Sequence, residues 1–199
     1  MEMIRSTPEL ERERIVREAR NCFLRYGWRS VSLDDLAGRI VMSKKKVYTY
    51  FESKEDLIRQ IIANDLEQLR TKVSYLLATR RNPIEQFLSV VTVFIGHWEF
   101  SDGKIVNDLH KYHPGIWSGA EQAKKDLISY FIDFNSAAGV AAQLYLRDID
   151  FHFLYRFLFD SVLLTDYPEA TKDELSRHFL RGLLTETGMH NYQSLGPVR

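Results

Sequence analysis

The 199-residue sequence contains a single cysteine, Cys22, which excludes an intramolecular disulfide bond. It has no run of about 18 consecutive apolar residues, so we predict no transmembrane helix. Its first residues carry too many charges for a secretory signal peptide. These absences predict a soluble, cytoplasmic protein. Helical spacing places Cys22 on an apolar face with Ile15, Ala19, Phe23 and Tyr26, so we expect it in the core.

The formal net charge of the sequence is zero, because 27 Lys and Arg residues balance 27 Asp and Glu residues. A strongly basic chain would bind nucleic acid indiscriminately, whereas this balance limits nucleic-acid binding to a local patch. The sequence also lacks a nucleophile elbow, a glycine-rich phosphate loop and a His-Glu-x-x-His zinc motif. We therefore expect neither an enzyme nor a cofactor.

Apolar residues recur at intervals of three and four along most of the chain, and no segment reads as a strand with a partner. This spacing predicts an all-α protein with about nine helices. After the N-terminal region we expect one long helix from Ser53 past Leu76. The next helix, from Pro83 to about Phe100, is apolar on nearly all sides and is therefore expected to be buried. Further helices are expected over about 103–112, 117–138 and 150–164, and a capping box at Thr171 is expected to start the last helix.

Three closely spaced helix starts near the N-terminus predict a helix-turn-helix. Ser32, Ser43 and Ser53 each stand where a helix N-cap is expected, and Asp35 and Asp56 follow the first and last of them by three residues. N-cap residues this close together predict short helices that cross one another.

The middle helix, over residues 43–51, has an unusual exposed face. At about 100° per residue, Val47 and Phe51 share the buried side, so Lys45 and Thr49 point most nearly away from it. Lysines near a helix start oppose the helix dipole, so three in succession need an anion to offset them. DNA phosphates are one such anion, and a solvated lysine patch is the alternative.

The segment from about Glu11 to Leu66 resembles the DNA-binding domain of the TetR family of bacterial transcriptional repressors. The positions that carry the resemblance are Phe23 and Gly27 of the Phe-x-x-x-Gly pattern, Ser30 and Ser32 before the second helix, Leu36 and Ala37 for the family's Ile-Ala pair, and Val47 to Leu57 for its Leu-Tyr-x-His/Tyr-Phe-x-x-Lys-Glu-x-Leu signature. One position departs from the family. Val41 stands in the turn that usually carries Gly, so either the turn is reshaped or a β-branched residue is strained there.

The resemblance implies a helix-turn-helix DNA-binding domain over residues 8–68, an effector-binding and dimerisation domain over 69–188 and a tail over 189–199. It also implies a homodimer that binds a palindromic double-stranded DNA operator, acts as a repressor and is released by a small, largely apolar effector. The DNA contacts that we predict are Ser32, Ser43, Lys44, Lys45, Lys46, Tyr48, Thr49, Tyr50 and Lys54. The alternatives are an all-α ligand-binding protein or enzyme without operator-specific binding, and a protein-interaction adaptor.

The central helices concentrate aromatic and amphipathic side chains, which form either an aromatic core or the lining of an effector site. The candidates for effector binding are Phe94, His97, Trp98, Tyr112, Trp117, Phe131 and Phe134. His110 and His113 are spaced to share a helix face and could hold a metal. We expect no metal, because no third histidine or cysteine follows at a conventional spacing.

The last two predicted helices carry more apolar surface than one small domain ordinarily covers, which indicates a protein interface. The resemblance implies that these helices form a four-helix bundle with their counterparts in a second subunit. The interface residues that we predict are Phe153, Phe157, Leu164, Phe179 and Leu183.

Overall fold

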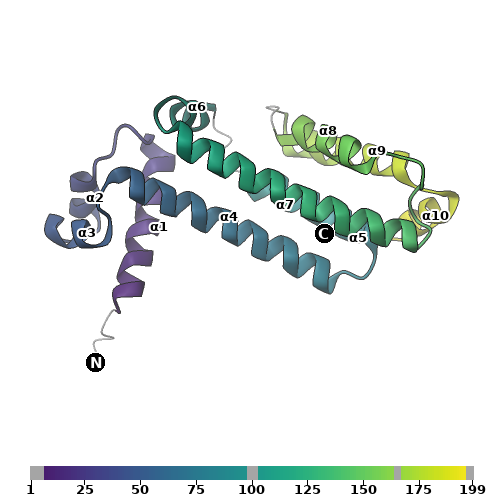
Figure 1. The fold of residues 1–199 in the computed structure, drawn as a ribbon, viewed down its shortest axis with the longest axis horizontal. Helices are drawn as coiled ribbons and strands as arrows, with labels where there is room; N and C mark the ends of the chain where they lie inside the picture. Colours follow the sequence, from purple (N-terminus) through teal and green to yellow (C-terminus); the bar gives the residue numbers. More distant parts are fainter. Residues whose placement is uncertain (1–6, 98–102, 164–166, 196–199) are drawn as a thin grey trace. The chain divides into compact units, whose positions relative to one another are not determined.

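The computed structural model describes residues 7–97, 103–163 and 167–195, which form ten α-helices (Figure 1). The helices are α1 (Pro8–Tyr26), α2 (Leu33–Arg39), α3 (Lys44–Tyr50), α4 (Lys54–Thr79), α5 (Pro83–His97), α6 (Gly103–Tyr112), α7 (Pro114–Ala141), α8 (Phe151–Leu163), α9 (Glu169–Leu183) and α10 (Glu186–Ser194). The predicted all-α class is confirmed, since the only β-type pairing among the described residues is an isolated bridge between Tyr145 and Leu184. No helix in these ranges is both long and apolar enough to cross a membrane.

The chain divides into two compact units. Unit 1 comprises residues 1–66 and 102–121, and unit 2 comprises residues 67–101 and 122–199. Helices α4 and α7 therefore each contribute to both units. Within unit 1, α2 packs against both α1 and α3, which gives the crossing helices of a helix-turn-helix.

The predicted helix starts in unit 1 are present as side-chain caps. Ser32 Oγ accepts the Asp35 amide at 3.1 Å, and the Asp35 carboxylate accepts the Ser32 amide at 2.9 Å, which completes a capping box. Ser43 Oγ accepts the Lys46 amide at 3.2 Å. These bonds satisfy amides at the helix N-termini that have no partner within the helix, and they hold the ends of α2 and α3 in place.

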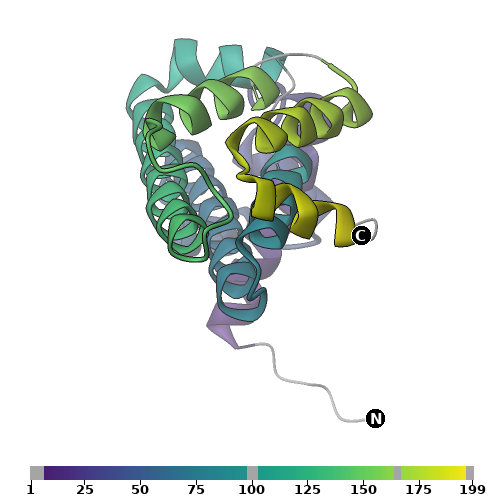
Figure 2. The same ribbon diagram turned by 90° about the vertical axis from the view of Figure 1, so that its right-hand side faces the viewer.

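Helix α5 lies at the centre of the unit 2 core. It packs against α8 and α9, which lie side by side (Figures 1 and 2). The ring of Phe87 on α5 lies 5.4 Å from that of Tyr155 and 6.2 Å from that of Phe179, measured between centroids. Because α5 is apolar on most sides, burying it from several directions is the arrangement that removes its surface from water.

Helix α9 begins earlier than the sequence predicts. We expected a capping box at Thr171, and this prediction is wrong, because α9 starts at Glu169 with Pro168 at its N-cap and no side-chain cap. The Pro168 carbonyl instead accepts the amides of Thr171 and Lys172 at 2.9 and 3.1 Å. The fixed φ of proline suits the start of a helix, so the chain enters α9 without a polar side chain to cap it.

Residues that we expected to form a tail lie largely in α10. Thr185 caps this helix by accepting the Gly188 amide at 3.0 Å, and its hydroxyl donates to the Gln143 carbonyl at 2.7 Å. The Thr185 amide donates to the Leu144 carbonyl at 3.0 Å. The segment between α9 and α10 is therefore bound to the segment after α7 through backbone groups, which the sequence pattern does not reveal.

The contact between the start of α10 and the segment after α7 requires glycine at position 188. A Cβ atom at this position would lie 2.1 Å from the Leu144 carbonyl oxygen, so backbone rather than a flexible side chain would have to move. We expect Gly188→Ala to lower the free energy of unfolding by about 2 kcal/mol and the melting temperature by about 4–8 °C. Thermal denaturation followed by circular dichroism measures both.

The matched control for this prediction is Gly182→Ala on α9, where an added Cβ would meet nothing within 4 Å. Alanine has the higher helix propensity, so this change should preserve or raise the melting temperature. Equal melting temperatures for the two variants would contradict the close approach at Gly188.

Candidate DNA-binding surface

Helix α3 has one fully buried side and one free side. Val47 and the C-cap residue Phe51 are both 0% exposed, as the sequence predicts. Lys45 and Thr49 are exposed, and Tyr48 is half-exposed, so these three side chains form the free face. Lys45 and Tyr48 on this face offer hydrogen-bond donors for phosphates and base edges, and the Thr49 hydroxyl, which donates to the Lys46 carbonyl, offers an acceptor.

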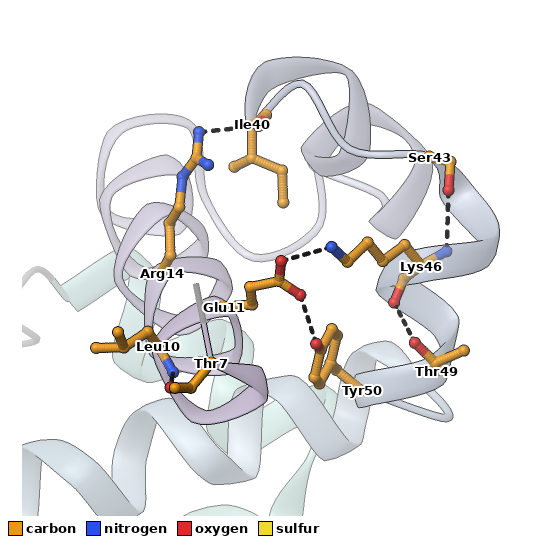
Figure 3. Close-up of polar contacts among 9 residues, drawn as sticks. All are labelled: Thr7, Leu10, Glu11, Arg14, Ile40, Ser43, Lys46, Thr49 and Tyr50. Atoms are coloured by element: carbon orange, nitrogen blue, oxygen red, sulfur yellow. Dashed lines mark hydrogen bonds and ion pairs between the residues drawn. The ribbon is translucent and has the colours of Figure 1, made fainter. Parts of the chain in front are cut away.

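Carboxylates from two neighbouring helices hold the flanks of α3. Glu11 of α1 accepts a hydrogen bond from Lys46 Nζ at 2.5 Å with one oxygen and from Tyr50 Oη at 2.6 Å with the other (Figure 3). On the other side, Lys44 Nζ lies 2.6 Å from the carboxylate of Asp34, which belongs to α2. The anions that offset two of the three lysines are therefore part of the protein itself.

The ionisation of these groups follows from the contacts. The hydrogen bond from Lys46, followed by that from Tyr50, lowers the pKa of Glu11, so its carboxylate is charged at neutral pH. The hydrogen bond to Glu11 raises the pKa of the Tyr50 hydroxyl, and the bond to Asp34 raises the pKa of Lys44. These contacts therefore favour the charged forms of Glu11 and Lys44 and the neutral form of Tyr50.

Four predicted DNA contacts, Thr49 of the free face among them, also make contacts within the protein. Ser32 and Ser43 use their hydroxyls as helix caps, and the Thr49 hydroxyl donates to the Lys46 carbonyl at 2.6 Å. Lys54, at the start of α4, places its ammonium 5.7 Å from the centroid of the Phe23 ring. Partial burial there lowers the pKa of Lys54. These side chains are fixed in position before any ligand arrives.

The sequence patterns do not predict that Glu11 and Asp34 belong to this surface. Their partners lie 35 and 10 positions away, so no helical spacing connects them. Arg14 is a third unpredicted contributor, because its guanidinium donates to the Ile40 carbonyl at 3.1 Å and so ties α1 to the end of α2 (Figure 3).

Val41 keeps the left-handed turn between α2 and α3. Its φ is 55°, a conformation that is strained for a β-branched residue, and its side chain is 89% exposed. The turn is closed by a hydrogen bond from the Met42 amide to the Ala37 carbonyl at 3.0 Å. Of the two alternatives left by the sequence, the chain therefore tolerates the strain and does not reshape the turn.

Relieving this strain should stabilise the protein. We expect Val41→Gly to raise the free energy of unfolding by about 1 kcal/mol and the melting temperature by about 2–4 °C, since glycine adopts a positive φ without steric cost. Val41→Ala is the matched control, because it removes the β-branching but keeps the Cβ, and it should have a smaller effect. A lower melting temperature for Val41→Gly would show that the turn is not strained.

Two of the predicted effector residues, Tyr112 and Trp117, belong to unit 1. Arg29 donates to the Tyr112 hydroxyl at 3.1 Å, and its guanidinium lies 4.6 Å from the centre of the same ring. The Trp117 ring meets that of His110 edge-on at 6.4 Å.

The second histidine considered as a metal ligand, His113, faces Glu55 at 3.7 Å, and the described residues contain no cluster of three metal-ligating side chains.

The other predicted effector residues belong to unit 2 or lie beyond the description. Phe94 and Phe131 are at most 1% exposed and sit in a continuous aromatic core, whereas Phe134 is 43% exposed beside Tyr130. His97 ends α5, and Trp98 lies outside the described residues.

The predicted interface residues also separate into two groups. Phe153 and Phe157 on α8 are 66% and 63% exposed and line an open groove of about 460 Å³ together with polar residues of the same segment, Asp150, His152, Arg156 and Asp160. Leu183 is 2% exposed within its own subunit, and Phe179 stacks on Phe87. Leu164 lies outside the described residues. Of the predicted interface residues that the structure describes, Phe153 and Phe157 on α8 are therefore the ones that are largely exposed.

Comparison with known proteins agrees with this geometry. Residues 15–61, which run from α1 into α4, match the family model of bacterial regulatory proteins of the tetR family. The HTH-type transcriptional repressor KstR2 of Mycolicibacterium smegmatis is 22% identical in a 160-residue alignment that covers 78% of this chain and 78% of that protein.

Solved structures share the fold over almost the whole chain. The ketosteroid transcriptional regulator KstR2 of Mycobacterium tuberculosis has a TM-score of 0.63 at 17% identity, covering 92% of this chain and 100% of its own. The fatty acid degradation regulator FadR of Bacillus halodurans has a TM-score of 0.70 at 14% identity, covering 89% of this chain and 97% of its own. Residues 15–61 therefore match the DNA-binding region of the tetR family of bacterial regulatory proteins, and over most of its length the chain is similar to DNA-binding transcription regulators.

Proposed function

We propose that this regulator is a repressor that binds a palindromic operator as a homodimer and is released by a small apolar effector. Residues 8–68 would form the DNA-binding domain and residues 69–188 the effector-binding and dimerisation domain. The observation that carries the proposal is the free face of α3, which is presented on a helix fixed from both flanks. Because its target is chromosomal DNA, the protein would act in the cytoplasm.

We assign α3 to the major groove of the operator. In helix-turn-helix proteins the second helix of the motif enters this groove, and threonine and lysine side chains reach base edges there. Thr49 would face base edges, while Lys45, Tyr48 and Lys54 would position the helix on the sugar–phosphate backbone and Tyr50 would stay bound to Glu11. Ser32 and Ser43 lie at the helix starts and complete the proposed surface.

A second subunit would cover the α8 face. Phe153 and Phe157 expose large aromatic side chains that one subunit leaves in water, and a two-fold partner would bury both copies. The two recognition helices would then lie about 34–36 Å apart and fit successive major grooves. The two-fold symmetry of such a dimer is the reason that we expect a palindromic operator, and the spacing sets the separation of its half-sites.

The effector is proposed to be apolar. Unit 2 is rich in aromatic side chains, including Phe94, Phe131 and Phe134, and sites for small apolar molecules are lined by such residues. Two relatives point in the same direction, since their names refer to a ketosteroid and to fatty acid degradation. We therefore propose a steroid or a long-chain fatty acid as the class of effector.

The operator proposal is tested by selection from a random pool of DNA duplexes with the purified full chain. The expected result is an enriched motif with two-fold symmetry, with half-site centres about 10 base pairs apart or a multiple of this. Footprinting and a salt titration on the selected duplex should then show a steep decrease in affinity with salt. An enriched motif without symmetry would contradict the homodimer, and no enrichment would contradict operator-specific binding.

The effector proposal is tested on the same duplex. We expect a long-chain fatty acid or a ketosteroid, added in the micromolar range, to lower the fraction of duplex bound, with acetate as the polar control. Release by neither apolar probe would contradict this class of effector, and tighter binding would reverse the proposed direction of control.

A further inference from the structure

We propose that Lys45 is the one lysine of α3 that pairs with DNA phosphates, and that Lys44 and Lys46 are positioning residues which hold α3 between α1 and α2. This inference rests on the proposed binding of α3 to DNA. It differs from the expectation drawn from the sequence, in which all three consecutive lysines contact the duplex.

The contact between Glu11 and α3 is the stronger of the two braces. Both Glu11 oxygens are used, one by Lys46 and one by Tyr50, at 2.5 and 2.6 Å (Figure 3). The Glu11 side chain is 17% exposed, so water competes little for it. Short hydrogen bonds to a charged acceptor are stronger than neutral ones, and two of them fix the direction in which α3 faces α1.

The Asp34–Lys44 pair holds the opposite flank more weakly. The Lys44 Nζ and the Asp34 carboxylate oxygen are 2.6 Å apart, but the Lys44 and Asp34 side chains are 66% and 46% exposed, so solvent and salt screen the attraction. Lys45 lies between these flanks on the free face and pairs with no carboxylate among the described residues. Each lysine of the run therefore has a different electrostatic environment.

This difference has a measurable consequence for DNA binding. A lysine that neutralises a phosphate releases condensed counterions from the duplex, and each such contact adds about 0.9 to the slope of log K against log salt concentration. A lysine that keeps its own carboxylate brings no net charge to the duplex. Lys46 should therefore add little to the slope while Glu11 is present, whereas Lys45 should contribute fully.

The test compares Glu11→Gln with the wild-type chain on a short duplex of mixed sequence, by fluorescence anisotropy over a series of salt concentrations. Loss of the carboxylate frees Lys46 for phosphate, so the slope should steepen by about 0.9 per bound subunit and the affinity near 0.1 M salt should rise about eight-fold. Adding Lys46→Met to Glu11→Gln should return the slope to the wild-type value.

The matched control is Glu9→Gln, which removes the same charge from an exposed position in the first turn of α1 and should leave the slope nearly unchanged. Among single lysine variants, Lys45→Met should reduce the slope by about 0.9 per subunit, and Lys46→Met should reduce it far less. The comparison of these two lysine variants decides the proposal even if Glu11→Gln does not fold.

Equal slopes for Lys45→Met and Lys46→Met, or equal effects of Glu11→Gln and Glu9→Gln, would overturn the inference while leaving DNA binding intact. A wild-type chain that binds no duplex at any salt concentration would instead overturn the proposed function, and this inference with it.

Discussion

Replacing Asn135 with leucine is expected to lower the free energy of unfolding by about 3 kcal/mol, through the loss of a buried hydrogen-bond network in unit 2. Asn135 lies on α7 and is 0% exposed. Its amide nitrogen donates to the Pro83 carbonyl at 2.8 Å and to Gln86 Oε1 at 3.3 Å. Its amide oxygen accepts the hydroxyls of Tyr155 and Tyr145 at 2.8 and 3.1 Å.

The large expected effect comes from the partners that leucine would leave behind. Burial raises the pKa of both tyrosine hydroxyls, so each remains neutral and needs an acceptor at any physiological pH. Tyr145 keeps the Pro83 carbonyl at 3.0 Å, but Tyr155 would lose the Asn135 amide oxygen that accepts its hydroxyl. A buried polar group without a partner costs about 1–3 kcal/mol, and several groups of this network lose a bond together.

Thermal or urea denaturation measures this loss, and the melting temperature should decrease by about 6–12 °C. Tyr155→Phe is the matched control, since it removes one hydroxyl without stranding the others, and it should cost about 1 kcal/mol. Wild-type stability in Asn135→Leu would mean that apolar packing replaces the network without loss.

The helix-turn-helix could be predicted from the sequence because its determinants are local. The caps at Ser32 and Ser43 lie three residues from their partners, and the burial of Val47 follows from helical spacing alone. For the turn at Val41 the sequence left two alternatives, a reshaped turn or a strained one, and the φ of 55° corresponds to the strained one. Local rules of this kind fixed the secondary structure of the whole surface.

The environment of that surface could not be predicted, because it depends on residues brought together by the tertiary fold. Glu11 reaches Lys46 only after α1 packs in the helix-turn-helix, and Asn135 reaches Pro83 only after α5 and α7 meet. The Thr185 cap likewise needs the segment after α7. A charge run therefore shows that an anion is required but not whether the protein or the ligand supplies it.

The second large effect is expected from Phe157→Glu on α8. Phe157 is 63% exposed, so a charged residue costs the fold of one subunit little. In the proposed dimer the same position is covered by a partner, and an unpaired carboxylate buried there would cost several kcal/mol. We therefore expect Phe157→Glu to give a folded monomer. Sedimentation equilibrium would establish its mass, and circular dichroism its helical fold.

Loss of the dimer should carry a loss of operator binding, because two linked recognition helices bind one palindrome far more tightly than either alone. The expected decrease in affinity for the selected operator is on the order of 100-fold or more. Binding to a mixed-sequence duplex should persist, since Lys45 and the rest of α3 are unchanged.

Tyr75→Glu on α4 is the matched control, because Tyr75 is 66% exposed and lies on a different helix. A variant at Phe157 that remains dimeric would place the subunit contact elsewhere, whereas a monomer with full operator affinity would show that one recognition helix is sufficient.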